Sequence, residues 1–388
     1  MKYNFDAVPN RRTPNVLNKW TWYPKDVLPM WIADMDFPSP PPILDALRKQ
    51  VEHGVLGYED TPKTLLETVA ARMAKLYNWD VSPDMIVVIP GVNVGYNVAA
   101  RTFCTPRRGY LIQTPVYNEF HEARKKTGVP QVEAPLVKKV EGNRISYEVD
   151  FDAFARAVRK VGMFLLCSPH NPIGRVYSRM ELKRMAEACI KNDVLIVSDE
   201  IHSELLLGGA EFQPMAALSR EIANHTITLT SASKAFNVPG LFCGFAIIPN
   251  KKLREKYKET VIKMGLHVAS PGLTAARVAY SGKCDAWLKE LRKYLTTNRD
   301  FLLEYLLEFM PGIHITVPEA TYLAWLDCSE LKLEPSPYEF FLKKAKVGLS
   351  DGGKFGRGSK QFVRLNFGTP RRTLEQGLSR MRKALRDH

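Results

Sequence analysis

The sequence predicts an α/β protein with a mostly parallel sheet in a large domain, helices on both faces of that sheet, and a smaller α+β domain. Three observations support this prediction. The chain has 388 residues, more than one compact domain usually holds. Short apolar segments alternate with amphipathic helical segments through the middle of the chain. After about Gly282 this alternation gives way to one long helical stretch, followed by isolated strands and short helices.

The strands of the predicted sheet are apolar at consecutive positions, which is typical of strands that are covered on both faces. They occupy residues 86–89, 110–112, 163–167, 194–198, 226–230 and 242–248. Two helices precede them. The first runs from Pro42 to His53 and ends at Gly54, and the second begins at Thr61 and Pro62, where a capping hydroxyl comes before a proline.

The C-terminal part of the chain is expected to form the smaller domain. A long helix at about residues 285–310 is followed by strands near 322–326 and 362–367 and by helices near 338–346 and 373–386. We therefore divide the chain into residues 1–45, an N-terminal arm with part of the small domain, residues 46–284, the large domain, and residues 285–388, the small domain. The prolines from Pro38 to Pro42 would join the arm to the large domain.

Composition limits the class of protein. Hydrophobic residues make up 45% of the chain and charged residues 25%, which is the balance of an ordinary globular protein. No apolar run reaches the roughly 18 residues that a membrane span needs, and the first twelve residues lack the apolar core of a signal peptide. We therefore expect neither a membrane protein nor an exported one.

The six cysteines are scattered and include no Cys-x-x-Cys pair. This pattern predicts buried free thiols in a reducing compartment, and hence a cytoplasmic location, rather than a disulfide framework or a metal site. The net charge of +14 permits nucleic-acid binding, but the basic residues are spread along the chain. A solvated basic surface explains them without a nucleic-acid partner.

Two motifs with reactive side chains follow predicted strands, at the edge where open α/β sheets bind ligands. In the segment from Ser231 to Lys234, a lysine comes after two serines. Such a lysine can form a Schiff base with an aldehyde cofactor, or can simply be a surface residue. Asp199 follows the strand at 194–198. It can pair with a protonated pyridine nitrogen, cap a helix, or bind Mg²⁺ together with Glu200.

Two further motifs follow the strands at 163–167 and 86–89. Asn171 stands in a proline-rich turn from Ser168 to Gly174, which positions its side chain without identifying a ligand. The turn from Pro90 to Gly95 opens a helix whose free amide groups can bind phosphate, although it lacks the lysine of a P-loop. Each motif is weak alone, and their joint order along the chain is the deciding observation.

The order glycine turn, Asn171, Asp199 and Lys234 resembles that of the fold-type I enzymes that depend on pyridoxal 5′-phosphate (PLP). These enzymes form the aspartate-aminotransferase superfamily, which includes the class I and II aminotransferases. The resemblance covers nearly the whole chain. It implies the PLP-dependent transferase fold, PLP as the cofactor, a small amino acid as the substrate, and a homodimer with shared active sites.

The same resemblance implies roles for the residues of these motifs. Lys234 would form the Schiff base, Asp199 would pair with the pyridinium nitrogen, and Asn171 would donate to the cofactor's 3′-oxygen. Tyr117 would stack on the ring, and we count it with Lys234 and Asp199 as catalytic. Arg364 would grip the substrate α-carboxylate, for which a planar two-pronged guanidinium is suited, with Asn171 as a second substrate contact.

The cofactor phosphate has its own set of implied residues. Val92 and Asn93 would offer backbone amides, and Ser231 and Ser233 would offer hydroxyl groups. Tyr58 would reach the phosphate of the neighbouring subunit. These groups would stabilise a dianion by hydrogen bonding and by the field of a helix start.

Two departures from the aminotransferase pattern resemble the cystathionine β-lyase-like branch of C–S lyases. His202, expected among the cofactor-binding residues, stands where many aminotransferases have a tyrosine, and Phe242 stands where many have a phosphate-binding arginine. The sequence does not name the basic group that compensates for that arginine. The segment from Pro29 to Phe37 also resembles this branch, in which it folds over the active site and its backbone near Ala33 meets the substrate carboxylate.

The branch implies a C–S β-lyase that converts cystathionine, cysteine or an S-substituted cysteine to a thiol, pyruvate and ammonia. An aminotransferase, which exchanges an amino group between an amino acid and a keto acid, is the alternative, because both reactions begin when the amine of Lys234 removes the Cα proton. A regulatory or nucleic-acid-binding protein on the same scaffold is a third hypothesis, whose only motive is the net charge of +14.

Overall fold

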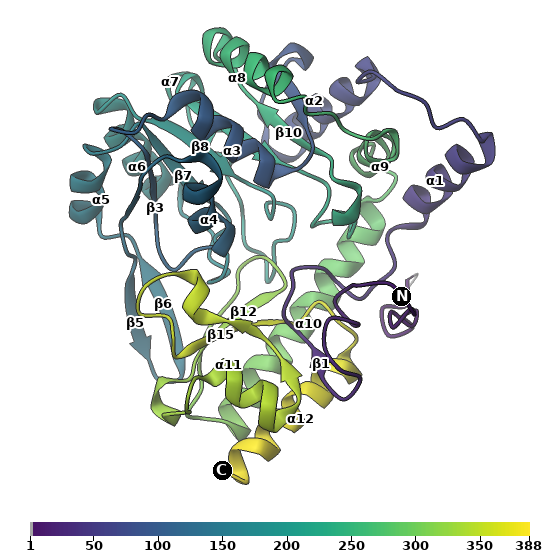
Figure 1. Ribbon diagram of the computed structural model, residues 1–388, viewed down its shortest axis with the longest axis vertical. Coiled ribbons are helices and arrows are strands. Elements are labelled where there is room, and N and C mark those ends of the chain that lie inside the picture. The colour runs from purple at the N-terminus through teal and green to yellow at the C-terminus, as the bar shows by residue number, and fades with distance from the viewer. Residues whose placement is uncertain (1–2) are drawn as a thin grey trace.

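The structure is a computed structural model that describes residues 3–388; the first two residues of the predicted arm lie outside this range. Figure 1 shows a large α/β body in the upper part of the view. A second, smaller sheet lies in the lower part with helices α11 (Pro337–Phe340) and α12 (Arg371–Arg386). The long helix α10 (Asp285–Phe309) extends from the upper part into the lower one, and the N-terminal arm, in purple, lies on the right of the lower part in this view.

The large sheet confirms the predicted mostly parallel architecture. Among the described residues it has seven strands in the order β2-β10-β9-β8-β7-β3-β4, and β10 alone runs antiparallel to its neighbours. The strands are β2 (Ile86–Ile89), β3 (Tyr110–Ile112), β4 (Gln131–Glu133), β7 (Met163–Cys167), β8 (Leu195–Asp199), β9 (Thr226–Thr230) and β10 (Gly244–Ile247). The strand predicted at 242–248 was too long, because Phe242 has a left-handed backbone with φ of 45°.

Helices cover both faces of this sheet because successive strand residues point to opposite sides. The helices are α1 (Pro41–His53), α2 (Lys63–Tyr77), α3 (Val92–Phe103), α4 (Asn118–Thr127), α5 (Phe151–Val158), α6 (Arg179–Lys191), α7 (Arg220–Asn224), α8 (Lys251–Lys263) and α9 (Ser270–Tyr280). Leu165 and Val197 lie in a core with α3, α4 and α8, whereas Phe164 and Ile196 lie in another core with α5 and α6. A third core joins α1, α2 and α9 to the smaller sheet.

The ends of two predicted helices can be compared with the structure. α1 ends at Gly54, whose left-handed φ of 80° confirms the predicted stop. α2 begins directly after Pro62, which is itself the N-cap residue and offers no side-chain hydrogen bond. The predicted capping by Thr61 is therefore wrong, because Thr61 lies one residue before the N-cap and the extended Pro62, with φ of −63° and ψ of 133°, takes that position.

The smaller sheet combines distant parts of the chain. Among residues 3–388 it has six strands in the order β14-β15-β12-β11-β6-β5. They are β5 (Val137–Glu141), β6 (Arg144–Glu148), β11 (His314–Thr316), β12 (Leu323–Asp327), β14 (Ser350–Asp351) and β15 (Phe362–Asn366). The hairpin of β5 and β6 falls within residues 46–284, the range predicted for the large domain, yet β6 pairs with β11. The division of the chain into domains stays a prediction, with this hairpin as an exception to it.

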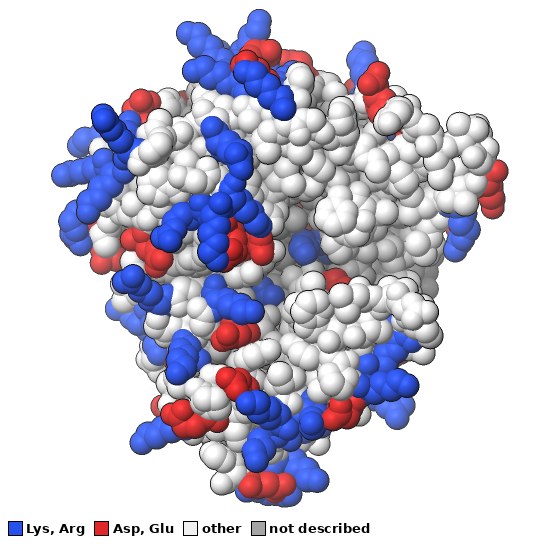
Figure 2. All heavy atoms as spheres, viewed as in Figure 1, with Lys and Arg blue, Asp and Glu red and all other residues white. Residues whose placement is uncertain are grey.

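The surface carries charges of both signs. In Figure 2, lysine and arginine side chains extend along most of the outline of this face, with acidic side chains among them. Such mixing is what a solvated basic surface would give. Within the described range, no helix is both long enough and apolar enough to cross a membrane.

One buried arginine connects the large body to α10. The Arg72 side chain, on α2, donates to both carboxylate oxygens of Glu204 and, at 2.8 Å, to Asp285 at the start of α10. Its guanidinium also lies over the rings of Phe236 and Tyr280, at 5.5 and 5.3 Å from their centroids. Glu204 lies in the loop that follows β8. This cluster therefore fixes that loop at the C-terminal end of the strand.

We expect Arg72→Met to lower the free energy of unfolding by about 3–5 kcal/mol, because it leaves the buried Glu204 carboxylate without its two-pronged partner. The matched control is Arg48→Met, which removes an exposed ion pair with Asp45 and should cost at most about 1 kcal/mol. Urea unfolding of both variants at one protein concentration measures the difference. Equal losses in the two variants would contradict the role given to Arg72.

Candidate active site

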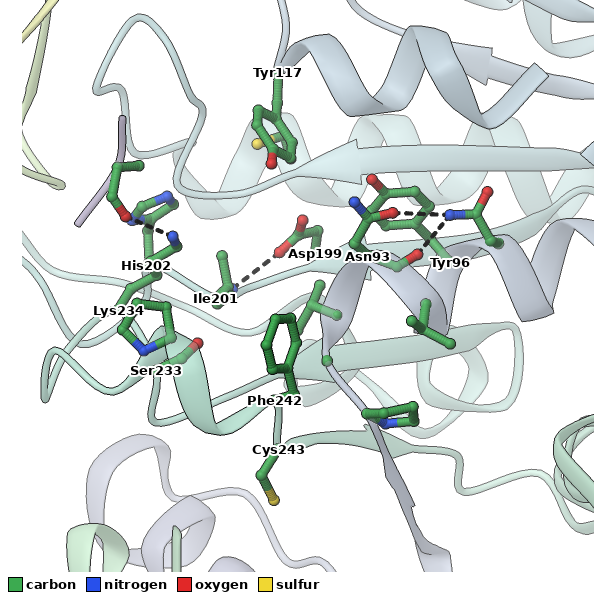
Figure 3. Close-up of a pocket in the computed structure, with 18 of the residues that line it drawn as sticks. Asn93, Tyr96, Tyr117, Asp199, Ile201, His202, Ser233, Lys234, Phe242 and Cys243 are labelled. Carbon is green, nitrogen blue, oxygen red and sulfur yellow. Dashed lines mark hydrogen bonds between the residues drawn. The ribbon is translucent and has the colours of Figure 1, made fainter. Parts of the chain in front are cut away.

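One cavity of about 570 Å³ lies at the C-terminal ends of the central parallel strands, beside the start of α3. Figure 3 shows the side chains that face it. Nine of the predicted site residues line this cavity: Ala33, Val92, Asn93, Tyr117, Asn171, Asp199, His202, Ser233 and Lys234. The structure thus brings most of the predicted site together, from segments that span 202 positions of the chain between Ala33 and Lys234.

Lys234 and Asp199 meet because β8 and β9 are parallel neighbours. Asp199 is the last residue of β8, and Lys234 follows the end of β9 by four residues. The Lys234 amine donates to the Ala33 carbonyl at 2.6 Å, and burial lowers its pKa to about 8. Burial also raises the pKa of Asp199 to about 7, although its carboxylate accepts the backbone N–H of Ile201 at 3.1 Å.

Arg364, on β15, is a buried cation next to the cavity. It donates to the Asn171 Oδ1 atom at 2.9 Å, to the Trp31 carbonyl at 3.0 Å and to the Ser350 hydroxyl at 3.1 Å, while its Nε atom has no partner. Burial lowers the pKa of Arg364 to about 10. Among residues 3–388 no carboxylate pairs with Arg364, so its guanidinium is suited to an anionic ligand.

The contact with Arg364 also orients Asn171. A guanidinium can only donate hydrogen bonds, so the carbonyl oxygen of the Asn171 amide faces Arg364. The NH₂ group of the same amide is then directed elsewhere, as a donor. This is the orientation that the predicted role of Asn171 requires.

The start of α3 offers backbone amides to the cavity. Its N-cap is Gly91, with a φ of 105° that favours glycine, and no side chain caps the helix. The amides of Val92 and Asn93 therefore have no intrahelical acceptor and suit an anion. Ser233 lines the cavity, whereas Ser231 lies behind it and donates to the Cys243 carbonyl at 2.6 Å. The prediction had given both serines the same direct contact.

Two cations that the sequence did not single out also line the cavity. Lys126 pairs with Glu119, which accepts a hydrogen bond from the Asn93 side chain at 3.2 Å, and Arg101 donates to the Lys126 carbonyl. Among the described residues that line the cavity, Lys126, Arg101 and Lys234 are the ones with a lysine or arginine side chain. Lys126 belongs to a basic run on α4 that looks in sequence like an ordinary solvated helix face.

The loops that carry Tyr117 and Asn171 are joined by a buried histidine. Tyr117 is the N-cap of α4, and Figure 3 shows its ring facing the same space as Asp199. His170 Nε2 lies 2.7 Å from the Pro115 carbonyl and its Nδ1 lies 2.8 Å from the Tyr177 hydroxyl. Burial lowers the pKa of His170 to about 4, so the ring is neutral near pH 7 and carries one proton. Because the Pro115 carbonyl can only accept, that proton lies on Nε2, and Nδ1 accepts from the Tyr177 hydroxyl.

Three predicted residues have surroundings that the sequence did not reveal. His202 is buried beside Lys234, its Nδ1 has no partner, and burial lowers its pKa to about 3. The Ala33 carbonyl is occupied by the Lys234 amine and by the Tyr322 hydroxyl, at 2.8 Å, so the carbonyl is not open to a substrate. Tyr58 lies outside this cavity, fully exposed in a separate surface pocket.

Comparison with known proteins identifies the family. The family described as aminotransferase class I and II matches residues 25–381. The chain belongs to this family. Within it, the chain is 37% identical over 364 residues to cystathionine beta-lyase PatB of Bacillus subtilis, covering 93% of each chain. It is 30% identical over 367 residues to the protein MalY of Escherichia coli, covering 93% of this chain and 92% of that one.

Solved structures agree with this assignment. The crystal structure of cystalysin from Treponema denticola, which contains a PLP cofactor, has a TM-score of 0.93 at 31% identity and covers all of both chains. A PLP-bound C–S lyase from Staphylococcus hominis has a TM-score of 0.91 at 30% identity, with 99% of this chain and 98% of that one covered. The predicted fold and the resemblance to the cystathionine β-lyase-like branch of this family are confirmed.

We predict that acidification destabilises the protein through His170. Its pKa is about 4 in the folded protein against an ordinary 6.5, so between these values the unfolded chain binds a proton that the folded protein does not. The free energy of unfolding therefore falls as pH decreases through this window, by about 1.4 kcal/mol per pH unit for this group. His202 acts in the same direction.

Urea unfolding of wild type and His170→Gln at several pH values in this window provides the test. The variant should be less stable near neutral pH, because it loses the contacts to Pro115 and Tyr177, but should lose less stability on acidification. Parallel curves for the two proteins would show that His170 takes up a proton in the folded state.

Proposed function

We propose that this chain binds PLP through Lys234 and acts as a C–S β-lyase on cystathionine, cysteine or an S-substituted cysteine, releasing a thiol, pyruvate and ammonia. The observation that carries the proposal is that the half-buried Lys234 and the buried Asp199 line one cavity at the C-terminal ends of the parallel strands. The names of similar proteins support it, since the Bacillus subtilis relative is a cystathionine beta-lyase and cystalysin contains PLP.

The residues of the cavity fit this cofactor. Within the described chain, Asp199 receives one backbone hydrogen bond and no cation contacts it, so a protonated ring nitrogen would supply the missing positive partner. His202 Nδ1 and the Tyr96 hydroxyl are buried, line the cavity and have no partner. The uncapped start of α3 suits the phosphate. When bound, PLP supplies an aldehyde carbon and a ring that accepts electrons from the substrate Cα.

The chain's own groups account for binding the substrate and moving its proton. Arg364 would hold the α-carboxylate with its unpaired Nε edge, while its Nη1 group is fixed by the hydrogen bond to the Asn171 amide. The Lys234 amine, with a pKa of about 8, is a suitable base for the Cα proton near neutral pH. Lys126 and Arg101 are candidates for the positive charge that Phe242 does not supply at the phosphate.

The lyase is preferred to the aminotransferase because relatives named as lyases share more sequence identity with this chain than a relative named as an aminotransferase. Proteins named cystathionine beta-lyase are 37% and 32% identical to this chain, whereas a probable aspartate/prephenate aminotransferase of Aquifex aeolicus is 27% identical over 373 residues. Chemistry favours the same choice. After loss of the Cα proton, departure of a β-thiolate is an intramolecular step, whereas transamination needs a second proton transfer and a second substrate.

We predict that elimination exceeds transamination in specificity constant. Pyruvate release from cystathionine and from S-substituted cysteines would be compared with keto-acid formation from alanine, aspartate, aromatic and branched amino acids with 2-oxoglutarate. Lys234→Ala should lose both activities. If any transamination pair exceeds the best elimination substrate by about tenfold, a barrier difference of about 1.4 kcal/mol, the aminotransferase replaces the lyase as the proposed function.

We further propose that the enzyme is a cytoplasmic homodimer in which Tyr58 enters the neighbouring active site. Exposed apolar side chains support the dimer: Val51, Val55, Leu56 and Tyr58 lie within eight positions of one another, and Phe242 and Met264 lie at the cavity. A second copy of the chain would remove these side chains from water. The six cysteines are free, five of them buried, which supports a reducing compartment.

Subunit mixing tests the dimer. Lys234→Ala and Tyr58→Ala should each be inactive or strongly impaired as pure dimers. In a mixed dimer, one site would combine an intact Lys234 with an intact Tyr58 from the other chain, so equal mixing should restore roughly a quarter of wild-type activity. No recovery after verified subunit exchange would exclude a site shared through Tyr58.

A further inference from the structure

Tyr322 and Lys234 meet on a single oxygen atom. Tyr322 precedes β12 and is fully buried. Its hydroxyl donates to the Ala33 carbonyl at 2.8 Å, and the Lys234 amine donates to the same carbonyl at 2.6 Å. The Tyr322 ring also packs edge-on against His202, with 6.3 Å between centroids. A tyrosine of the smaller sheet and a lysine of the large body therefore converge on the N-terminal arm.

The Ala33 carbonyl is a fixed acceptor because side chains hold the arm on both sides of it. The Asn366 amide donates to the carbonyls of the two flanking residues, Ile32 at 2.6 Å and Asp34 at 2.7 Å. Asn237, three residues after Lys234, donates to two further carbonyls of the arm at 3.0 and 2.6 Å. The oxygen between these anchors cannot turn away without breaking several hydrogen bonds.

We propose that Tyr322 is a positioning residue whose hydroxyl fixes the Ala33 carbonyl as the docking site of the Lys234 amine whenever that amine is free during turnover. The inference rests on the proposed function, in which the Lys234 amine takes the substrate Cα proton and becomes an ammonium group. A lysine side chain has many rotamers, so a fixed acceptor restricts its nitrogen to the position from which it reacts. Tyr322 acts on the amine through Ala33 and touches no reacting atom.

The electrostatic effect of Tyr322 on the amine has a definite sign. The other groups facing the amine are the carboxylates of Asp34 and Asp199, the guanidinium of Arg364 and the imidazole of His202. A hydroxyl that donates to the Ala33 oxygen withdraws electron density from it, so the oxygen stabilises an ammonium less. Removing the hydroxyl should therefore raise the pKa of Lys234, and water entering the space it leaves would act in the same direction.

The test uses Tyr322→Phe and measures the amine directly. In the apoprotein, the rate at which an amine-specific reagent labels Lys234 is followed against pH by mass spectrometry of its peptide. We expect the midpoint of this curve of labelling rate against pH to lie about half to one pH unit higher in the variant than in wild type. In the enzyme loaded with PLP, we expect kcat to fall about tenfold with little change in KM.

Tyr294→Phe is the matched control. Tyr294 is also a buried tyrosine, and its hydroxyl also bonds to the arm, at the Asp6 carboxylate, and accepts from the Arg371 amide at 2.7 Å. This variant should lose stability without moving the Lys234 midpoint. If both variants leave the midpoint and kcat unchanged, or change them equally, Tyr322 is only structural and the inference is overturned.

A second substitution covers the case in which Tyr322→Phe does not fold. Replacing Tyr322 by 3-fluorotyrosine keeps its shape and makes the hydroxyl a stronger donor, so the Lys234 midpoint should move down instead of up; an unmoved midpoint contradicts the inference. The labelling needs no cofactor, so its outcome is independent of the product assay. Failure of the lyase assay would remove the proposed function, and failure of the midpoint shifts would remove only the role of Tyr322.

Discussion

The proposed chemistry of this protein depends on three charged side chains in or next to one cavity that make no direct ion pairs among the described residues: the half-buried Lys234 and the buried Asp199 and Arg364. Burial is the largest influence on each, lowering the pKa of the two cations and raising that of the carboxylate. The folded chain must offset this cost elsewhere, for example in its continuous apolar cores.

The central part of the site could be predicted from the sequence because it follows from strand order. Asn171 and Lys234 follow β7 and β9 and Asp199 ends β8, and these are adjacent parallel strands, so the three side chains are brought to one edge. The sequence predicts the site less well where the side chains of neighbouring residues point in different directions. Ser231 and Ser233 look equivalent in sequence, but only Ser233 lines the cavity, because the hydroxyl of Ser231 is directed to a backbone carbonyl.

Contacts between segments far apart in the chain could not be predicted in this way. Tyr322 reaches Ala33 across 289 positions and Asn366 reaches Asp34 across 332, and neither contact leaves a periodic pattern in the sequence. Such contacts are needed because the arm between β1 (Leu28–Pro29) and α1 is irregular and has few strand partners. Side-chain amides satisfy its carbonyls instead, and a buried pair of Lys19 and Asp36, 3.1 Å apart, secures it further.

The arm thereby couples the smaller sheet to the reactive lysine, and this coupling bears on which reaction the site favours. In the proposed lyase the Lys234 amine would move one proton, from Cα, before the thiolate leaves. Transamination would require the same amine to carry that proton to a second carbon and then to serve a second substrate. An amine that returns to one fixed carbonyl, in an arm held around Ala33 by Tyr322, Asn366 and Asn237, is better arranged for the single transfer. Preference for elimination would then lie in the rigidity around Lys234 as well as in the identity of the residues that line the cavity.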